Sequence, residues 1–144
     1  MASAAHVSIV HAGEREFAKW RKAHPDEHLD LAYADLRKLD LRDADLASAN
    51  MSHADLSGAD LRGSNLANAV LDGSYLSSTT LAGADLSKAQ LAGARAELSN
   101  LEGARLVKAW LPDTVWLDCS LTGATLCGAG FCQPAGYPRT GSPG

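Results

Sequence analysis

The sequence predicts an all-β solenoid, in which short extended segments wind into stacked coils. From Leu29 to Gln133 the chain divides into twenty-one consecutive five-residue units, with no net slip in phase. The third residue is Leu in seventeen units, and the first is Ala, Ser, Thr or Cys in nineteen. A period of five fits neither the roughly 3.6-residue period of an amphipathic helix nor the two-residue period of a half-buried strand. The repeat therefore predicts a different way of burying its leucines.

Extended backbone explains why the first and third residues of a unit are the apolar or small ones. These two residues share a face of an extended segment, so both can point inward. The second, fourth and fifth residues then point outward or form a corner. One unit cannot bury its own Leu, so the units must stack as the modules of other repeat proteins do.

The units follow an A(D/N)LxG-like rule, which the stretch ADLSGADLRGSNL at 54–66 shows clearly. This pattern resembles the pentapeptide-repeat family. The resemblance implies a right-handed quadrilateral β-helix with four units to a coil and slightly more than five coils in this chain. With neighbouring strands about 4.8 Å apart, the rod is expected to be roughly 25 Å long.

The first 28 residues lie outside the repeat and are expected to cap the first coil. HVSIV at 6–10 is predicted to form one short strand, and Glu14 to His24 a helix that ends at Pro25. Phe17 and Trp20 lie on one face of that helix and are expected to cover the open coil, which needs a lid. Four bases, Arg15, Lys19, Arg21 and Lys22, are expected on its solvated side.

The segment 134–144 is rich in Pro and Gly and is expected to be a flexible tail. Tyr137 is a candidate cover for Phe131. The three predicted regions are therefore a cap over 1–28, a β-helix over 29–133 and this tail.

Residues twenty apart are expected to stack on one face, which gives a meaning to the irregular units. Ala96 replaces an inward Leu, and Trp116 lies twenty residues later. A large indole above a small methyl group restores the lost core volume, since an empty site would cost about 2 to 5 kcal/mol. In the alternative, Leu98 or Leu117 turns inward and changes the register.

The second place of the first eight units is always Asp or Asn, and two interpretations compete. Short carboxylates and carboxamides bond readily to nearby backbone groups in turns. Alternatively, these residues form an acidic surface, for which the candidates are Asp35, Asp40, Asp45, Asp55 and Asp60. Arg42 and Arg62, two positions after an Asp, are expected to offset the repulsion between stacked acids.

One column has little charge after the first coil and is a candidate partner surface. Its outward residues include Val70, Gln90, Trp110 and Pro112. An apolar patch with a Trp often marks a protein interface. The sequence therefore suggests a protein partner or a homodimer through this face.

The sequence suggests neither an enzyme nor a metal or cofactor protein. The three cysteines form no CxxC motif, the histidines gather near the N-terminus, and no Ser pairs with a His in a motif. No apolar run approaches the roughly 18 to 20 residues of a membrane span. An odd number of thiols and an N-terminus unlike a secretion signal favour a cytoplasmic protein without a membrane partner.

Two classes of function follow. The first is a non-catalytic scaffold or interaction module. The second, implied by the family resemblance, is a DNA-mimicking rod that binds DNA gyrase or another type II topoisomerase and protects it from poisons. About 25 Å of duplex bears roughly 15 negative charges, whereas the repeat holds 13 acids and 8 bases, a net of minus 5. This weakens mimicry, and the overall charge of minus 4 argues against direct binding of nucleic acid.

Overall fold

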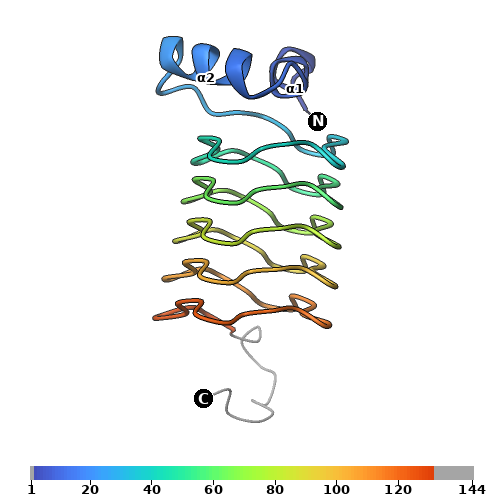
Figure 1. Cartoon of the computed structure of the whole chain (residues 1–144), viewed down its shortest axis with the longest axis vertical. Coiled ribbons are helices and arrows are strands. Elements are labelled where there is room, and N and C mark those ends of the chain that lie inside the picture. Colours follow the sequence, from blue (N-terminus) through green and yellow to red (C-terminus); the bar gives the residue numbers. More distant parts are fainter. Residues whose placement is uncertain (1, 132–144) are drawn as a thin grey trace.

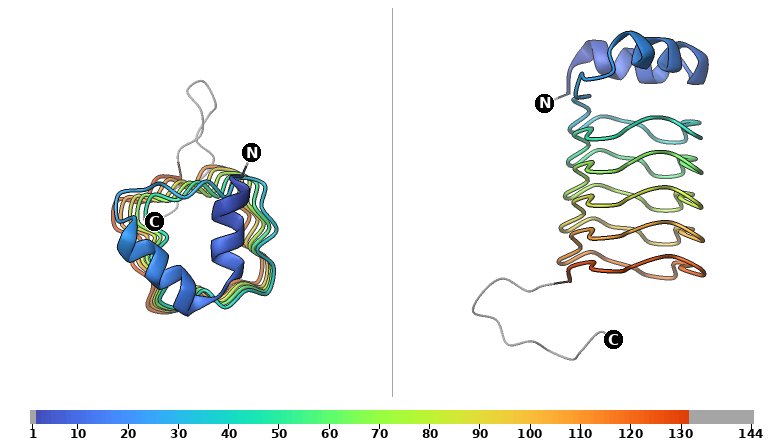
Figure 2. Two further views of the ribbon diagram at one scale, coloured as in Figure 1. Left: turned by 90° about the horizontal axis from the view of Figure 1, so that it is seen from above. Right: turned by 90° about the vertical axis from the view of Figure 1, so that its left-hand side faces the viewer.

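The computed structural model describes residues 2–131, which form a solenoid of stacked coils with two helices across its N-terminal end (Figure 1). Each unit pairs with the unit twenty residues later through a single parallel bridge at the second place, from Asp30 with Asn50 to Trp110 with Gly130. Four units therefore make one coil, and the view along the axis shows a four-sided outline (Figure 2). The coils comprise residues 29–48, 49–68, 69–88, 89–108 and 109–128.

We name the four sides by one second-place residue each. The Trp110 face carries residues 30, 50, 70, 90 and 110. The Asp35 face carries 35, 55, 75, 95 and 115. The Asp40 face carries 40, 60, 80, 100 and 120, and the Asp45 face carries 45, 65, 85, 105 and 125.

Backbone hydrogen bonds between coils follow one rule along the rod. The third-place N–H donates to the second-place carbonyl of the next coil, as from Leu31 to Asn50 at 2.7 Å, and the second-place N–H donates back to the first-place carbonyl, as from Asn50 to Leu29 at 2.8 Å. No described segment pairs for longer than one residue, so the rod contains bridges rather than long strands. Corners occupy the fourth and fifth places.

Each described corner from residue 33 to residue 128 places its fifth residue at a positive φ, between 53° and 71°. This conformation is costly for a residue with a Cβ, which explains why Gly is frequent at this place. The other occupants include Tyr33, Leu98 and Lys108.

The interior is a column of leucines and small residues. In the inner coils the third-place side chains, Met51 and Ala96 among them, are fully buried. Some hydroxyls in the small first place donate to carbonyls of the preceding coil, as Thr79 Oγ1 does to Leu56 O at 2.8 Å, whereas the buried hydroxyls of Ser64 and Ser74 have no partner within the described residues. The last coil differs, since its inward residues Leu121 and Leu126 remain more than a third exposed, as does Phe131.

Ala96 and Trp116 keep the register that the twenty-residue column predicts. Ala96 N donates to Val115 O at 2.9 Å, and the half-buried Trp116 packs against the core cluster that contains Ala96. Leu98 is 64% and Leu117 57% exposed, so the alternative in which one of them turns inward is wrong. The continuous bridge ladder leaves no register change for them to fill.

The predicted strand at 6–10 is wrong, because this segment is part of helix α1, Ala4–His11. The β-branched residues favour a strand only where a sheet edge receives them. Here a helix satisfies its own backbone and directs Val10, which is buried, toward the first coil.

Helix α2, Glu14–Ala23, forms where a helix was predicted. Phe17 is buried and stacks on the partly buried Trp20, with ring centroids 6.2 Å apart. Arg15, Lys19 and Lys22 are exposed as expected, whereas Arg21 is only 9% exposed. The expectation of a solvated Arg21 is therefore wrong, since its guanidinium lies under the helix.

Arg21 is buried because it helps to close the edge of the first coil. The second-place carbonyls of that coil have no preceding coil to bond to. Asp30 O accepts from Ser3 N at 3.0 Å, Asp35 O from His11 Nε2 at 2.8 Å and Asp45 O from Arg21 Nε at 3.1 Å. The cap thus supplies the donors that a preceding coil would otherwise provide. The expected tail at 134–144, and with it Tyr137, lies outside the described residues.

Candidate interaction surfaces

The second-place Asp and Asn side chains organise the backbone. Their Oδ1 atoms accept from the backbone N–H two residues later, at 2.9 to 3.3 Å, as Asp35 does from Arg37. This arrangement occurs at Asp30, Asp35, Asp40, Asp45, Asn50, Asp55, Asp60, Asn65, Asp85 and Asn100. The sequence allowed either hydrogen bonds to the backbone of turns or an acidic surface. Each of these residues makes the hydrogen bond that the first interpretation describes.

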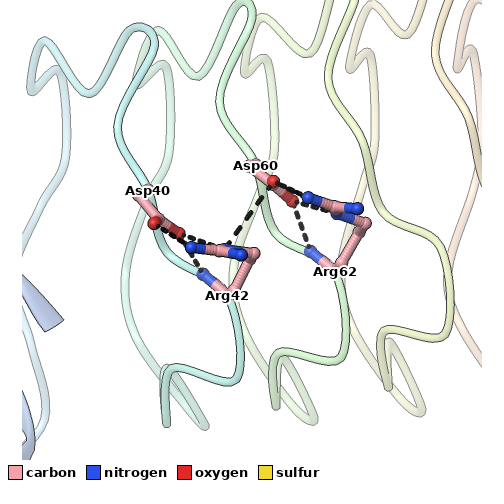
Figure 3. A network of polar contacts seen from close by, with 4 residues as sticks. All are labelled: Asp40, Arg42, Asp60 and Arg62. Atoms are coloured by element: carbon pink, nitrogen blue, oxygen red, sulfur yellow. Dashed lines mark hydrogen bonds and ion pairs between the residues drawn. The ribbon is translucent and has the colours of Figure 1, made fainter.

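Three of the units read Asp-Leu-Arg, and each forms a two-bonded ion pair on the surface. Arg42 donates to Asp40 from Nε at 2.8 Å and from Nη2 at 2.6 Å, and Arg62 makes the same contact with Asp60 (Figure 3). Arg37 and Asp35 repeat it on the neighbouring face. The two-residue spacing puts both side chains outward with Leu between them pointing in.

These pairs also connect successive coils. Arg42 Nε lies 3.9 Å from Asp60 Oδ2, and Arg37 Nε lies 3.9 Å from Asp55 Oδ2. The hydrogen bond from Arg42 lowers the pKa of Asp40 to about 2, and Arg37 and Arg62 likewise lower the pKa of Asp35 and of Asp60.

The candidate acidic residues are therefore interleaved with bases. Asp45 has Arg21 Nε at 4.0 Å and accepts from Asn65 Nδ2 at 3.3 Å. The other four candidate carboxylates lie against Arg37, Arg42 and Arg62, so the five acids and four bases of this group have a net charge of minus 1. A surface of this kind presents alternating charges rather than a continuous negative field.

The structure places Val70, Gln90, Trp110 and Pro112 on the Trp110 face. The bridges stack Val70, Gln90 and Trp110 directly, and Trp110 is 44% exposed. Sequence reasoning omitted Asp72, which lies at the fourth place of the same face. Its Oδ1 accepts from Ala92 N at 2.8 Å, because Gln90 makes no turn bond to that N–H. Beyond Asp30, the Trp110 face thus has no charged residue at its second places and carries its charges at its margins.

The two margins of the Trp110 face differ in charge. Lys88 and Lys108 occupy the corner before the face, and Asp72 and Asp113 lie at the corner after it. Lys108 and Asp113 enter no ion pair within residues 2–131. The twenty-residue column of fifth-place residues could have revealed this polarity from the sequence.

A second apolar region lies on the Asp35 face and was also missed. Tyr75 is 48% and Val115 39% exposed, and the exposed Leu98 donates its N–H to Leu117 O at 2.8 Å. Arg95 lies between Tyr75 and Val115 in the same column and pairs with Glu97 at 3.1 Å. A charged pair therefore interrupts this region, unlike the centre of the Trp110 face.

A cavity of about 200 Å³ separates the cap from the first coil near Asp40. Its walls include Val10, Phe17, Leu41 and Arg21. Within the described chain, Arg21 Nη2 is buried without a hydrogen-bond partner. The cavity marks a corner that the cap closes less completely.

Cysteine and histidine side chains do not gather in the part of the chain that the structure describes. Residues 2–131 contain no cluster of three potential metal ligands. Cys119 is partly buried and Cys127 exposed, and both are free thiols, while Cys132 lies outside the described residues. Neither helix in residues 2–131 is long and apolar enough to cross a membrane.

Comparison with known proteins gives related repeats. The family model described as pentapeptide repeats matches residues 28–63 and 59–95, with eight copies. A pentapeptide repeat protein from Nostoc PCC 7120 is 31% identical over 78% of this chain and 74% of its own, with a TM-score of 0.30. Rfr23 from the cyanobacterium Cyanothece 51142 is 33% identical over 56% of this chain and 58% of its own, with a TM-score of 0.31.

QnrB1, a plasmid-mediated fluoroquinolone resistance protein, is 18% identical over 72% of this chain and 64% of its own, with a TM-score of 0.31. The chain thus spans less than two thirds of Rfr23 and of QnrB1. No curated protein matches. The superpositions are poor, so the family model and the sequence identities carry the assignment. By its repeated units and these similarities, the chain belongs to the pentapeptide-repeat family.

Proposed function

We propose that this protein is a non-catalytic interaction module that presents the Trp110 face to a protein partner. The observation that carries the proposal is Trp110 itself, 44% exposed at the centre of a side whose charges beyond the first coil lie at its margins. Trp residues dominate binding energy at many protein interfaces. The stacked coils hold this side chain on a rigid support, which lowers the entropy that binding must overcome.

The charged residues of the rod support a binding role over a catalytic one. The second-place acids hold backbone turns, and several of them also pair with Arg. A catalytic site needs groups that converge on a substrate atom, whereas these groups repeat along a surface.

The proposal includes right-handed winding of the coils and, because the cysteine number is odd, a cytoplasmic location.

Site-specific photocrosslinking in the producing cell tests the proposal. A benzophenone amino acid replaces Gln90 on the Trp110 face or, as the matched control, Glu102 on the opposite Asp40 face. We expect a discrete protein adduct from position 90 that disappears when Trp110→Glu is added. Adducts of equal yield from both positions, or adducts that survive Trp110→Glu, would sink the proposal.

DNA gyrase is the second candidate partner, on the strength of the family resemblance and of the acidic residues on the first two coils. The Arg interleaving described above weighs against it, because DNA presents an unbroken negative charge. A gyrase supercoiling assay with a fluoroquinolone tests this candidate. Protection or inhibition by the parent that is lost on changing Asp35, Asp40, Asp45, Asp55 and Asp60 to Asn would favour gyrase. No effect of the parent at micromolar concentration would remove it.

A further inference from the structure

One stretch of chain crosses the Trp110 face with opposite charges at its two ends. Lys108 stands at the corner before the face, Trp110 at its centre, and Pro112 and Asp113 form the corner after it. Five residues of extended chain span at most about 16 Å, so the two charges lie on opposite margins with the indole between them. Lys88 and Asp72 add one more charge of the same sign to each margin, one coil or two toward the N-terminus.

Two copies of this face can meet in two symmetric ways. If the two-fold axis runs along the rods, the rods are parallel and the Lys margin of each copy lies against the Asp margin of the other. If the axis runs across the rods, they are antiparallel and each margin meets its own kind. Opposite charges attract across an interface and like charges exclude a wrong arrangement.

We propose that the Trp110 face binds a second copy of this chain in the parallel arrangement. This rests on the proposed function and names the partner at the same face. The two Trp110 indoles meet at the axis. Each Lys108 ammonium then faces Pro112 and Asp113 of the second copy, and each Lys88 faces the margin that carries Asp72.

The small area of the face limits how tightly two copies can bind. Four coils at about 4.8 Å and a width of about 16 Å give a projected contact of roughly 300 Å² per copy. This lies at or below the low end of specific protein interfaces. The association is therefore weak, and it populates the dimer only at micromolar concentration or above.

Two singly substituted variants of the full chain, measured alone and then mixed, test the arrangement by sedimentation velocity. Lys108→Glu places two acids on facing margins, and Asp113→Lys places two bases there, so each should weaken the dimer at least about tenfold. Mixed together, the two variants should form a heterodimer, because each margin again meets its opposite. Asp113→Lys leaves the corner conformation available, since Lys38, Lys88 and Lys108 already occupy fifth places at positive φ.

The outcomes that would contradict the proposal, and the control variant, are as follows. In the antiparallel arrangement each margin would still meet its own kind, so Lys108→Glu alone would dimerise no more weakly than the parent, and it would bind the unchanged protein more tightly than the parent binds itself. Either result would overturn the proposal. Lys38→Glu, on a corner away from this face, is the control and should leave the dimer intact. A parent that stays monomeric throughout the concentration range also overturns the proposal. It does not touch the proposed function, which the crosslinking at position 90 tests against other partners.

Discussion

At the scale of single residues, the place within the five-residue unit decides what a side chain does. Asp35 at the second place holds a turn, Leu36 at the third fills the core, and Lys38 at the fifth takes a positive φ. The same residue type therefore has a different role one place further along. Substitutions should be compared between equivalent places of different units.

Two glycines in one corner column allow the cost of a positive φ to be distinguished from the cost of a steric clash when Ala replaces Gly. Gly73 and Gly93 have φ of 65° and 67°, but a Cβ at Gly73 would lie 2.5 Å from the His53 ring, whereas at Gly93 nothing lies within 4 Å. Gly93→Ala should cost about 1 kcal/mol from φ alone. Gly73→Ala should cost more, because the ring must also leave its stack on Tyr33. Urea denaturation of both variants checks this, and equal losses would show that the ring moves freely.

The Asp40 ion pair predicts a loss of stability in acid. Arg42 lowers the pKa of Asp40 to about 2, from roughly 3.9 in an unfolded chain. A lowered folded-state pKa stabilises the fold above the unfolded value, and the contribution is lost as the pH falls from about 4 through 2.

Asp40→Asn should therefore show a flatter fall of the urea midpoint between pH 4 and pH 2 than the parent. The difference should be small, because both side chains are about half exposed and solvent screens the pair. In 1 M salt it should shrink further. Identical pH profiles for parent and variant would mean that the pair does not persist in solution.

At the scale of elements, the cap and the first coil depend on one another. The Arg21 guanidinium donates to the carbonyls of Asp45 and Glu27, at 3.1 and 2.7 Å, and lies 5.4 Å from the Trp20 ring centroid. Arg21→Ala should lower the free energy of unfolding by about 2 kcal/mol, since buried carbonyls lose a charged donor. Arg21→Lys should recover part of this loss. Thermal and urea unfolding of the three proteins measure it, and an unaffected Ala variant would show that water replaces the guanidinium.

The small side chain of Ala96 in a column of leucines leads to a second prediction, about the stability of an Ala96→Leu variant. Leu at this fully buried place would overpack the column against the partly buried Trp116 and should cost about 1 to 3 kcal/mol. Leu81→Ala, at another fully buried third place, is the matched control for removal of volume. An Ala96→Leu protein as stable as its parent in urea would mean that the indole does not fill this space.

The sequence predicts the coils well because one short rule recurs in them. Leu at the third place and Asp or Asn at the second suffice to set the inward face and the turns, and the α2 helix has its own apolar pair. The segment 6–10 was misjudged because β-branched residues are ambiguous until a partner is known. Arg21 was misjudged because its role depends on carbonyls that only the assembled coil presents. Lys108 and Asp113 were missed because their opposite charges become apparent only when the two margins of one face are compared.

At the scale of the whole molecule, the rod has two unlike ends. The cap covers the first coil, where leucines such as Leu31 and Leu36 are completely buried. In the last coil Leu111 is buried, whereas Leu121 and Leu126 are more than a third exposed within the described chain. The interaction proposed above lies along the side of the rod, so it does not depend on either end.

The twenty-residue spacing of the bridges has a consequence for how such a chain can change length. Removal of one five-residue unit keeps Leu facing inward but turns every later side chain by a quarter of a circle about the rod axis. If the removed unit lies between Gln90 and Trp110, Trp110 leaves its column with Gln90 and Val70. Removal of four units shortens the rod by one coil and restores every column. Lengthening or shortening by whole coils therefore preserves surface patterns, whereas single-unit changes reassort them.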